Sequence, residues 1–490
     1  MKILVCSSEV VPFAKTGGLA DVAGALPQVL NARGHEARVA MPNYALVNQE
    51  KARPVKVGEV TVLMGEEPVD AAILVSERVP GMPTYLVDCP RYFSGKHLYG
   101  EGEGPERFAF FCRAMLAFLR TSDWTPDVIH CNDWQTALIP VYLKTTYADD
   151  PKLNRIAILF TVHNLAYQGV FDPVVMERVG LEADLFTPDR LEFYGAVNFL
   201  KGGLVFADVL NTVSETYSRE IQTEEYGERL EGVLAGRRED LFGVINGLDY
   251  GEWNPATDRY LAAHYDADNL AGKAACKADL QQKLSLPQRP DVPLFGLVSR
   301  LASQKGLDLL AEVLPHLLRM DVQFALLGSG EEDYQDLMTD LASQHPSKMA
   351  AVIGFDNRLA HQIYAGCDFF LMPSHYEPCG LGQLISVRYG TIPVVRQTGG
   401  LADTITDYDP ETGEGNGFSF AERSAVALLG AMFRGMVTKQ EGAAWTQLMK
   451  NAMACDFSWD RSAEAYVGLY QRAGERHRVG VEWLSINRPR

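Results

Sequence analysis

Short apolar runs alternate with amphipathic stretches in the second half of the chain. The apolar runs predict strands at 294–299, 323–327, 351–355, 369–373 and 392–395. Between them, apolar residues recur at helical spacing over 307–320, 332–343, 358–365 and 381–389. Strands that alternate with helices are typical of a doubly wound parallel sheet, which binds ligands at the carboxyl ends of its strands. This half is predicted to be a Rossmann-like domain.

The first half shows the same alternation less regularly. Strands are predicted at 2–7, 36–41, 61–63, 71–75, 84–88, 128–130, 156–162 and 209–212, and helices at 19–33, 106–120, 136–142 and 191–206. We expect one Rossmann-like domain over 1–244 and a second over 245–459, because Gly, Asn, Asp and Pro cluster near 244–255. A terminal helix, about 460–490, is expected to pack back on the first domain.

The hexapeptide Thr-Gly-Gly-Leu-Ala-Asp occurs twice, at 16–21 and at 398–403. Each copy follows an apolar segment and opens a helical pattern. Adjacent glycines let the backbone approach a ligand closely, and a helix N-terminus offers unpaired N–H groups. The simplest interpretation is two α/β domains, each presenting a glycine loop to a shared cleft that holds a phosphorylated ligand.

Composition narrows the class of protein. The chain has 490 residues, 47% of them hydrophobic, and a net charge of −18 from 45 basic and 63 acidic residues. Such an acidic chain does not suit nucleic acid, and ordinary cytoplasmic solubility explains its charge. None of the 8 cysteines has CxxC spacing, and no apolar run approaches the ~20 residues of a membrane span. We expect a cytoplasmic protein with neither a nucleic-acid nor a membrane partner.

Two loops of the second half carry candidate chemistry, since each joins a predicted strand to a helix. In 299–306, Arg300 can fork onto phosphate oxygens and Lys305 can add a point charge, although a solvated loop is the alternative. In 375–382, Glu377 can accept hydrogen bonds from sugar hydroxyls, or act only as a surface or capping residue. The amides of Gly380, Leu381 and Gly382 can bind phosphate, and Cys379 is interpreted as a wall of the site.

The first half offers further candidates beside predicted strands. Lys15 is a cation on the first glycine loop, and Asp21 either caps the following helix or binds a hydroxyl. Asp133 and His163 each follow a strand. The histidine could donate to a sugar hydroxyl or stabilise developing positive charge through its backbone carbonyl, and a structural role is the alternative. Asn246 lies at the expected hinge, and a role in a turn explains this residue as well as a role in the site does.

Other motifs are weaker. Gly328-Ser329-Gly330 lacks the third glycine of a dinucleotide fingerprint, because residue 333 is Asp. The Asp pairs 266/268 and 407/409 match the pattern of metal-dependent sugar transferases but fall in polar, turn-like stretches. No Walker loop, HExxH or GxSxG is present.

Together these residues resemble the bacterial glycogen synthase and plant starch synthase family. The resemblance spans nearly the whole chain, and its motifs are 15–21, 132–134, 161–164, 246–249, Arg300 with 304–306, 377–381, 398–403 and 458–462. It implies a GT-B glycosyltransferase that transfers glucose from ADP-glucose to the non-reducing end of an α-1,4-glucan. The anomeric configuration would be retained, ADP released, and neither a metal nor pyridoxal phosphate required.

The resemblance also implies roles for individual residues. Lys15, Arg300 and Lys305 would bind the phosphates of the donor. The glucose would be surrounded by Gly18, His163, Asn246 and Glu377, and Asp133, with Asp21, would lie toward the acceptor. Two positions depart from the family pattern. Gly382 stands where the family often has Thr, and Phe355 stands where an aromatic residue, often Tyr, lies near the adenine.

Two alternative functions stay open at this point. A glucan phosphorylase would need pyridoxal phosphate on a lysine of the second half, and none between Lys305 and the Glu377 loop is a good candidate, since Lys348 lies beside a polar turn. A non-catalytic glucan-binding protein is disfavoured because every expected cationic and carboxylate position is filled.

Overall fold

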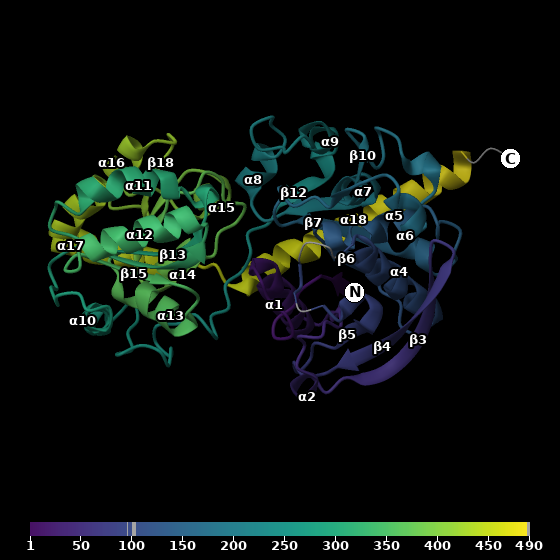
Figure 1. The fold of residues 1–490 in the computed structure, drawn as a ribbon, viewed down its shortest axis with the longest axis horizontal. Coiled ribbons are helices and arrows are strands. Elements are labelled where there is room, and N and C mark those ends of the chain that lie inside the picture. Colours follow the sequence, from purple (N-terminus) through teal and green to yellow (C-terminus); the bar gives the residue numbers. More distant parts are fainter. Residues whose placement is uncertain (96, 100–103, 488–490) are drawn as a thin grey trace. The chain divides into compact units, whose positions relative to one another are not determined.

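A computed structural model describes residues 1–95, 97–99 and 104–487. The chain divides into two compact units. Unit 1 comprises 1–213, 218–247 and 459–490, and unit 2 comprises 214–217 and 248–458. Figure 1 shows the helices and strands of each unit. Residues 488–490 of the expected terminal helix lie outside the described residues.

A nine-stranded sheet forms the centre of unit 1, in the order β12-β11-β7-β6-β1-β2-β5-β4-β3. The strands from β12 to β5 are parallel, whereas β4 pairs antiparallel with both β5 and β3. The bounds are β1 Lys2–Cys6, β2 Glu36–Pro42, β3 Val55–Met64, β4 Glu67–Ser76, β5 Thr84–Asp88, β6 Val128–Asn132, β7 Ala157–Val162, β11 Val209–Thr212 and β12 Leu241–Gly243. A separate antiparallel sheet has the order β8-β10-β9, with β8 Val170–Phe171, β9 Glu192–Phe193 and β10 Ala196–Asn198.

The helices between residues 1 and 247 are mostly short. They are α1 Gly18–Ala32, α2 Gln49–Ala52, α3 Pro90–Phe93, α4 Glu106–Thr121, α5 Leu138–Lys144, α6 Val175–Val179, α7 Phe199–Phe206, α8 Glu215–Glu220 and α9 Glu231–Gly236, with 3-10 turns η1 Trp134–Thr136, η2 Leu153–Arg155, η3 Ala183–Leu185 and η4 Arg238–Asp240.

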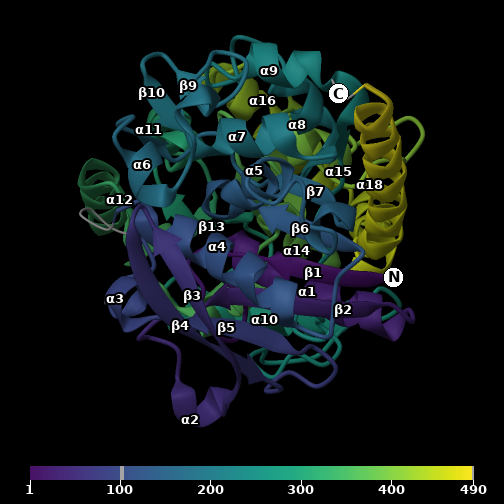
Figure 2. The same ribbon diagram turned by 90° about the vertical axis from the view of Figure 1, so that its right-hand side faces the viewer.

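The C-terminal helix belongs to unit 1 although it follows unit 2 in the sequence. This helix, α18 (Trp459–Asn487), packs against α1 and the strands β6, β7 and β11, and Figure 2 shows it in yellow beside the sheet. Its buried positions recur at helical spacing: Trp459, Ala463, Tyr466, Tyr470 and Ala473. This apolar stripe accounts for the docking of the helix.

A six-stranded parallel sheet forms unit 2, in the order β15-β14-β13-β16-β17-β18. Its strands are β13 Leu294–Leu301, β14 Gln323–Gly330, β15 Met349–Ile353, β16 Phe369–Met372, β17 Ile392–Arg396 and β18 Phe418–Phe420. Its helices are α10 Ala271–Lys283, α11 Leu307–Leu317, α12 Glu332–Gln344, α13 Asn357–Gly366, α14 Gly382–Arg388, α15 Gly399–Thr404, α16 Ala425–Gln440 and α17 Gly442–Met453, and η5 is Ser303–Lys305.

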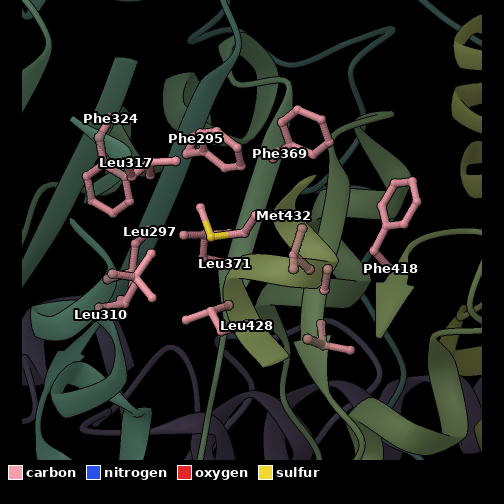
Figure 3. Packing of buried hydrophobic residues seen from close by; sticks show 14 of the residues in the cluster. Phe295, Leu297, Leu310, Leu317, Phe324, Phe369, Leu371, Phe418, Leu428 and Met432 are labelled. Carbon is pink, nitrogen blue, oxygen red and sulfur yellow. The ribbon is translucent and has the colours of Figure 1, made fainter. Parts of the chain in front are cut away.

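Apolar side chains from strands and helices interlock in the core of unit 2. Phe295 and Phe369 stack across β13 and β16 with ring centroids 4.8 Å apart, while Leu310 of α11 and Leu428 of α16 are fully buried in the same cluster (Figure 3). This core supports the carboxyl edge of the sheet, where the loops that follow β13 and β16 begin.

The structure confirms the doubly wound fold and most of the predicted elements. The helix predicted over 191–206 is wrong in its first half, because residues 192–198 form the β9–β10 hairpin and α7 begins at Phe199. Asn198 stops the helix from extending backwards, since its side chain accepts a hydrogen bond from Lys201 N and so caps α7.

Candidate active site

The two candidate loops of unit 2 lie side by side at the carboxyl edge of its sheet. Gly306 has φ +72°, and a Cβ placed there would lie 2.1 Å from the carbonyl oxygen of Pro373. His375 N donates to Gln304 O at 2.8 Å, and Gln304 Nε2 donates to Tyr376 O at 3.2 Å. Close backbone contact therefore fixes the loop after β13 against the loop after β16.

This contact brings Lys305 and Glu377 together. Lys305 Nζ lies 2.7 Å from Glu377 Oε2 and 2.9 Å from Oε1, and the exposed fractions of the side chains are only 18% and 8%. Ser374 Oγ donates a further hydrogen bond to Glu377 Oε2 at 2.9 Å. A nearly buried carboxylate is thus held in place by one cation and one hydroxyl.

Arg300 and Phe355 lie at the same edge but outside this pair. Arg300, near the end of β13, is exposed and donates to Gln304 Oε1 at 3.2 Å. Phe355 follows β15, two strands away from β13, and 91% of its surface is exposed. Within the described ranges, no hydrogen bond or ring contact joins Phe355 to Lys305 or Glu377. An open aromatic face and an accessible guanidinium are groups that a ligand could reach.

The second glycine repeat packs against the Glu377 loop. Gly399 has φ +44°, and a Cβ there would lie 2.0 Å from Glu377 O. At Gly400 a Cβ would lie 2.0 Å from Cys379 O. These glycines are required for contact between two protein loops, so a ligand contact at this repeat stays a prediction.

Gly380, Leu381 and Gly382 lead from this loop into α14. Gly380 has φ +74°, Leu381 precedes the helix and Gly382 begins it. A Cβ at Gly382 would lie 2.8 Å from the ring of the buried Phe370 and 3.2 Å from Met372 Sδ. Glycine at position 382 therefore leaves room for the ring of Phe370.

In unit 1 the first glycine repeat wraps around a carboxylate that the sequence analysis missed. Glu9, only 3% exposed, accepts hydrogen bonds from Thr16 N, from Thr16 Oγ1 at 2.9 Å and from Gly17 N at 3.3 Å. Burial raises the pKa of this carboxyl group, against the lowering effect of these hydrogen bonds. One feature of the sequence could have pointed to Glu9, because it is a single acidic residue within a stretch of apolar and small residues.

Lys15 of the same loop is paired with Asp21 in the first turn of α1. Lys15 Nζ lies 2.7 Å from Asp21 Oδ1, and the exposed fractions of the side chains are 52% and 32%. Gly18 is the first residue of α1, with Gly17 as the preceding cap position. The ammonium group of Lys15 is thus held at the first turn of α1, and its contact with a donor phosphate stays a prediction.

Asp133 and His163 meet at the carboxyl ends of β6 and β7. Asp133 Oδ1 accepts a hydrogen bond from His163 N at 2.7 Å, and Asp133 has φ +55°. Burial is the main cause that raises the pKa of Asp133 to about 7, with a further contribution from Glu9. The backbone of Asp133 is strained, which is a property of many functional sites.

The His163 side chain is neutral and oriented. Burial lowers its pKa to about 3. Asn132 Nδ2 donates to Cys6 O at 3.0 Å, so Asn132 Oδ1 is free to accept from His163 Nε2 at 2.9 Å. The imidazole therefore carries its proton on Nε2.

Asn246 differs from the other candidates because its side-chain oxygen is unsatisfied. Asn246 is 5% exposed, and its Oδ1 has no hydrogen-bond partner in the part of the chain that the structure describes. Neighbouring Ile245 O accepts from Ser462 Oγ of α18 at 2.7 Å, which holds this segment on unit 1. A buried, unpaired oxygen is a candidate contact for a ligand donor.

Among the described residues, no group of three or more His, Cys, Asp or Glu could hold a metal ion. Likewise, none of the helices described is long and apolar enough to cross a membrane.

Comparison with known proteins identifies the family. Residues 2–236 match the model of the starch synthase catalytic domain, and residues 280–435 match that of glycosyl transferases group 1. A glycogen synthase of Moorella thermoacetica is 50% identical over 487 residues, covering 98% of each chain. The chain belongs to the glycogen and starch synthase family. A glycogen synthase of Thermotoga maritima is 49% identical over 480 residues, covering 96% of this chain and 99% of that one.

A solved structure of this family has the same fold. The catalytic domain of starch synthase IV from Arabidopsis thaliana, bound to ADP and acarbose, matches with a TM-score of 0.90 and 34% identity over 97% of this chain and 99% of that one. A sucrose-phosphate synthase from Thermosynechococcus elongatus, 18% identical with a TM-score of 0.61, shares the fold. As a member of the synthase family the chain is a GT-B glucosyltransferase, so the phosphorylase and the non-catalytic alternatives are set aside.

Proposed function

We propose that the chain transfers glucose from ADP-glucose to the non-reducing end of an α-1,4-glucan, with retention of configuration and release of ADP. The observation that carries the proposal is the nearly buried Lys305–Glu377 pair beside Arg300, at the edge of a parallel sheet where ligands bind. The proposal assigns roles to residues of both units.

Three cationic side chains are assigned to bind the leaving diphosphate. Arg300 is accessible and its guanidinium can grip two phosphate oxygens, so it makes the first contact. Lys305 and Lys15 are each paired with a carboxylate, at 2.7 Å in both cases. The phosphates therefore compete with Glu377 and Asp21 for these ammonium groups, and binding of the donor frees the two carboxylates to accept hydrogen bonds from sugar hydroxyls.

Residues beside the transferred glucose act through neutral groups. The imidazole of His163 is uncharged, since burial lowers its pKa to about 3, so it adds no positive charge near an oxocarbenium-like centre. Its backbone carbonyl can stabilise that centre, and Asn246 Oδ1 can accept from a sugar hydroxyl. Gly18 gives a close approach of the backbone, while Asp133 is assigned to the acceptor.

Bond changes take place on one face of the sugar. The bond from glucose C1 to the phosphate oxygen breaks, the bond from C1 to the acceptor O4 forms, and the leaving phosphate accepts the O4 proton. No residue is assigned as a covalent nucleophile, unlike the paired carboxylates of retaining hydrolases. The cations bind the diphosphate more tightly as its charge grows, which stabilises the transition state.

The test is ADP release from ADP-glucose with and without glycogen, with UDP-glucose in parallel. We expect glycogen-dependent ADP release by the wild type. Replacement of Arg300 by Ala should lower kcat/KM by at least ~100-fold, because one charge-assisted, transition-state contact is lost. Arg319→Ala is the matched control, since Arg319 is exposed and lies between α11 and β14 at the opposite edge of the same sheet.

Each other outcome is informative. Turnover of UDP-glucose alone would retain the reaction type and change the nucleotide. An Arg300→Ala enzyme with wild-type kcat/KM would refute the role of Arg300, and a wild type that releases no ADP would refute the proposed function.

A further inference from the structure

An exposed aromatic residue occupies a backbone position that disfavours it. The β9–β10 hairpin pairs Phe193 with Ala196, so Tyr194 and Gly195 form its two-residue turn. Their φ values are +52° and +84°. Positive φ at both positions is typical of a type I′ turn, which favours Asn, Asp or Gly at its first position. A tyrosine in this conformation is uncommon.

Burial does not explain the tyrosine. Tyr194 is 72% exposed. Its ring meets the ring of Phe193 at 4.9 Å between centroids, and the guanidinium of Arg229 lies 5.3 Å from the centre of the Tyr194 ring. These contacts orient the ring but leave most of its surface open to solvent.

Other residues with positive φ lie beside Tyr194. Arg229 and its neighbour Glu228 have φ values of +66° and +48°. Tyr194, Glu228 and Arg229 are thus three of the six non-glycine residues with positive φ in the described ranges, and a fourth is Asp133 of the candidate site. Strain that is not relieved by packing points to a functional constraint.

One side chain links this region to the segment that begins at His163. Gln168 Nε2 donates to Glu228 O at 3.0 Å, and Gln168 Oε1 accepts from Asn198 Nδ2 of β10 at 2.6 Å. The preceding residue, Tyr167, is 55% exposed. Figures 1 and 2 both show β10 and α9 at the top of unit 1. Two open tyrosine side chains therefore belong to one connected surface region.

The charge of this surface region limits the classes of ligand that could bind to it. The segment around Arg229 is acidic, with Glu220, Glu224, Glu225, Glu228 and Glu231. Nucleic acid and phosphorylated ligands are disfavoured by such a surface. A neutral sugar polymer fits it, because the C–H face of a glucose ring can stack on the electron-rich face of an aromatic ring while its hydroxyls bond to polar neighbours.

We propose that Tyr194, oriented by Arg229 and accompanied by Tyr167, is a binding platform for an α-glucan chain. The platform holds the polymeric acceptor and makes no contact with the reacting atoms. This inference rests on the proposed function only in taking the glucan as the acceptor. Its ligand is the chain of the polymer, whereas Lys305 and Glu377 act on the donor.

The turn itself supplies a sharp variant. Tyr194→Asn removes the ring and installs the residue that a type I′ turn favours, so the hairpin should keep its conformation. We expect the KM for glycogen to rise about 5-fold, the loss expected for one aromatic contact, while kcat at saturating glycogen and the KM for ADP-glucose stay unchanged. The KM for maltotriose as a short acceptor should also stay unchanged. Tyr194→Phe keeps the ring and should retain the wild-type KM.

Binding must be measured separately from turnover. Migration of the wild type and the variants through gels with increasing glycogen, without any sugar nucleotide, gives a Kd that does not depend on catalysis. Tyr194→Asn and Tyr194→Gly should both bind glycogen more weakly, and thermal unfolding checks that both are folded. Unchanged glycogen binding by both variants would overturn the platform, and so would an equal loss in Tyr194→Phe. A wild type that binds glycogen but releases no ADP would refute the proposed function and leave the platform standing.

Discussion

At the scale of single residues, charged candidate residues within each unit neutralise one another in pairs. Lys305 is held by Glu377 and Lys15 by Asp21, whereas Arg300 is exposed. The residue types of these groups were predicted from the sequence, but their pairing was not. Pairing depends on distances between loops that are up to 72 positions apart in the chain.

Position 382 shows how one departure from a family pattern is compensated by its neighbour. We predict that Gly382→Thr lowers the free energy of unfolding by ~1–3 kcal/mol, because its Cβ would lie 2.8 Å from the Phe370 ring. Adding Phe370→Leu should recover part of that loss. Urea unfolding of the single and double variants measures the coupling. Additive effects of the two substitutions would show that the ring does not exclude the threonine.

Asp133 should make stability depend on pH. Burial raises its pKa from 3.8 to about 7, so between these values the folded chain binds more protons than the unfolded chain. Its favourable contribution is full below about pH 4 and is lost as the pH rises through about 7. Asn has nearly the same size and shape as Asp, so this substitution removes the titratable group and changes little else. Between pH 5 and pH 8, the free energy of unfolding of Asp133→Asn should therefore rise relative to that of the wild type. Urea unfolding at each pH measures both values. The same pH dependence in the two proteins would contradict the prediction.

At the scale of elements, the long C-terminal helix docks through polar contacts as well as apolar ones. Tyr470 OH lies 3.0 Å from His130 Nδ1, and His130 Nε2 lies 2.7 Å from Thr161 Oγ1. Burial lowers the pKa of His130 to about 3, so the ring is neutral. The sequence predicted a terminal helix at about 460–490, whereas the strands that it covers became clear only in the fold.

Removal of one hydroxyl should loosen this helix. Tyr470→Phe leaves a buried nitrogen of His130 without its partner, so we expect the free energy of unfolding to fall by ~1–3 kcal/mol. Turnover by the folded enzyme at 25 °C should not change. Val479→Ala on the same helix is the control, because Val479 is 63% exposed and its loss should change stability by less than ~0.5 kcal/mol. Equal stability of the Tyr470→Phe variant and the wild type would contradict the assigned role.

A helix was predicted wrongly where the β9–β10 hairpin lies, and the error has a physical reason. Residues 191–206 are apolar at helical spacing, but Asn198 caps α7 and Gly195 adopts a positive φ. Strands of two and three residues carry too little period-2 pattern to be recognised. The wrong prediction falls on the segment that carries Tyr194.

At the scale of the whole molecule, the two units differ in how their chain is arranged. Unit 2 is almost one continuous segment, 248–458, whereas unit 1 needs residues 459–487 to cover β6, β7 and β11. We predict that a fragment of residues 248–458 folds by itself and that a fragment of residues 1–247 does not. Circular dichroism and urea unfolding of each fragment test this.

Reconnection of the missing helix is the matched control. Fusion of residues 459–490 to residue 247 through a flexible linker should restore a cooperative unfolding transition to unit 1. A cooperative transition in the unfused fragment would show that α18 is not required for the fold.

The sequence by itself determined the fold class, most strands and helices, the family, and the residue types of the candidate site. Hydrophobic periodicity and glycine loops are local signals, so they can be read from neighbouring residues. Only the tertiary structure decided that Glu9 lies within the first glycine loop, that Phe370 fills the space beside Gly382, and that Tyr194, Gln168 and Arg229 form one surface region. These relations depend on contacts between distant segments, and no single stretch of sequence carries them.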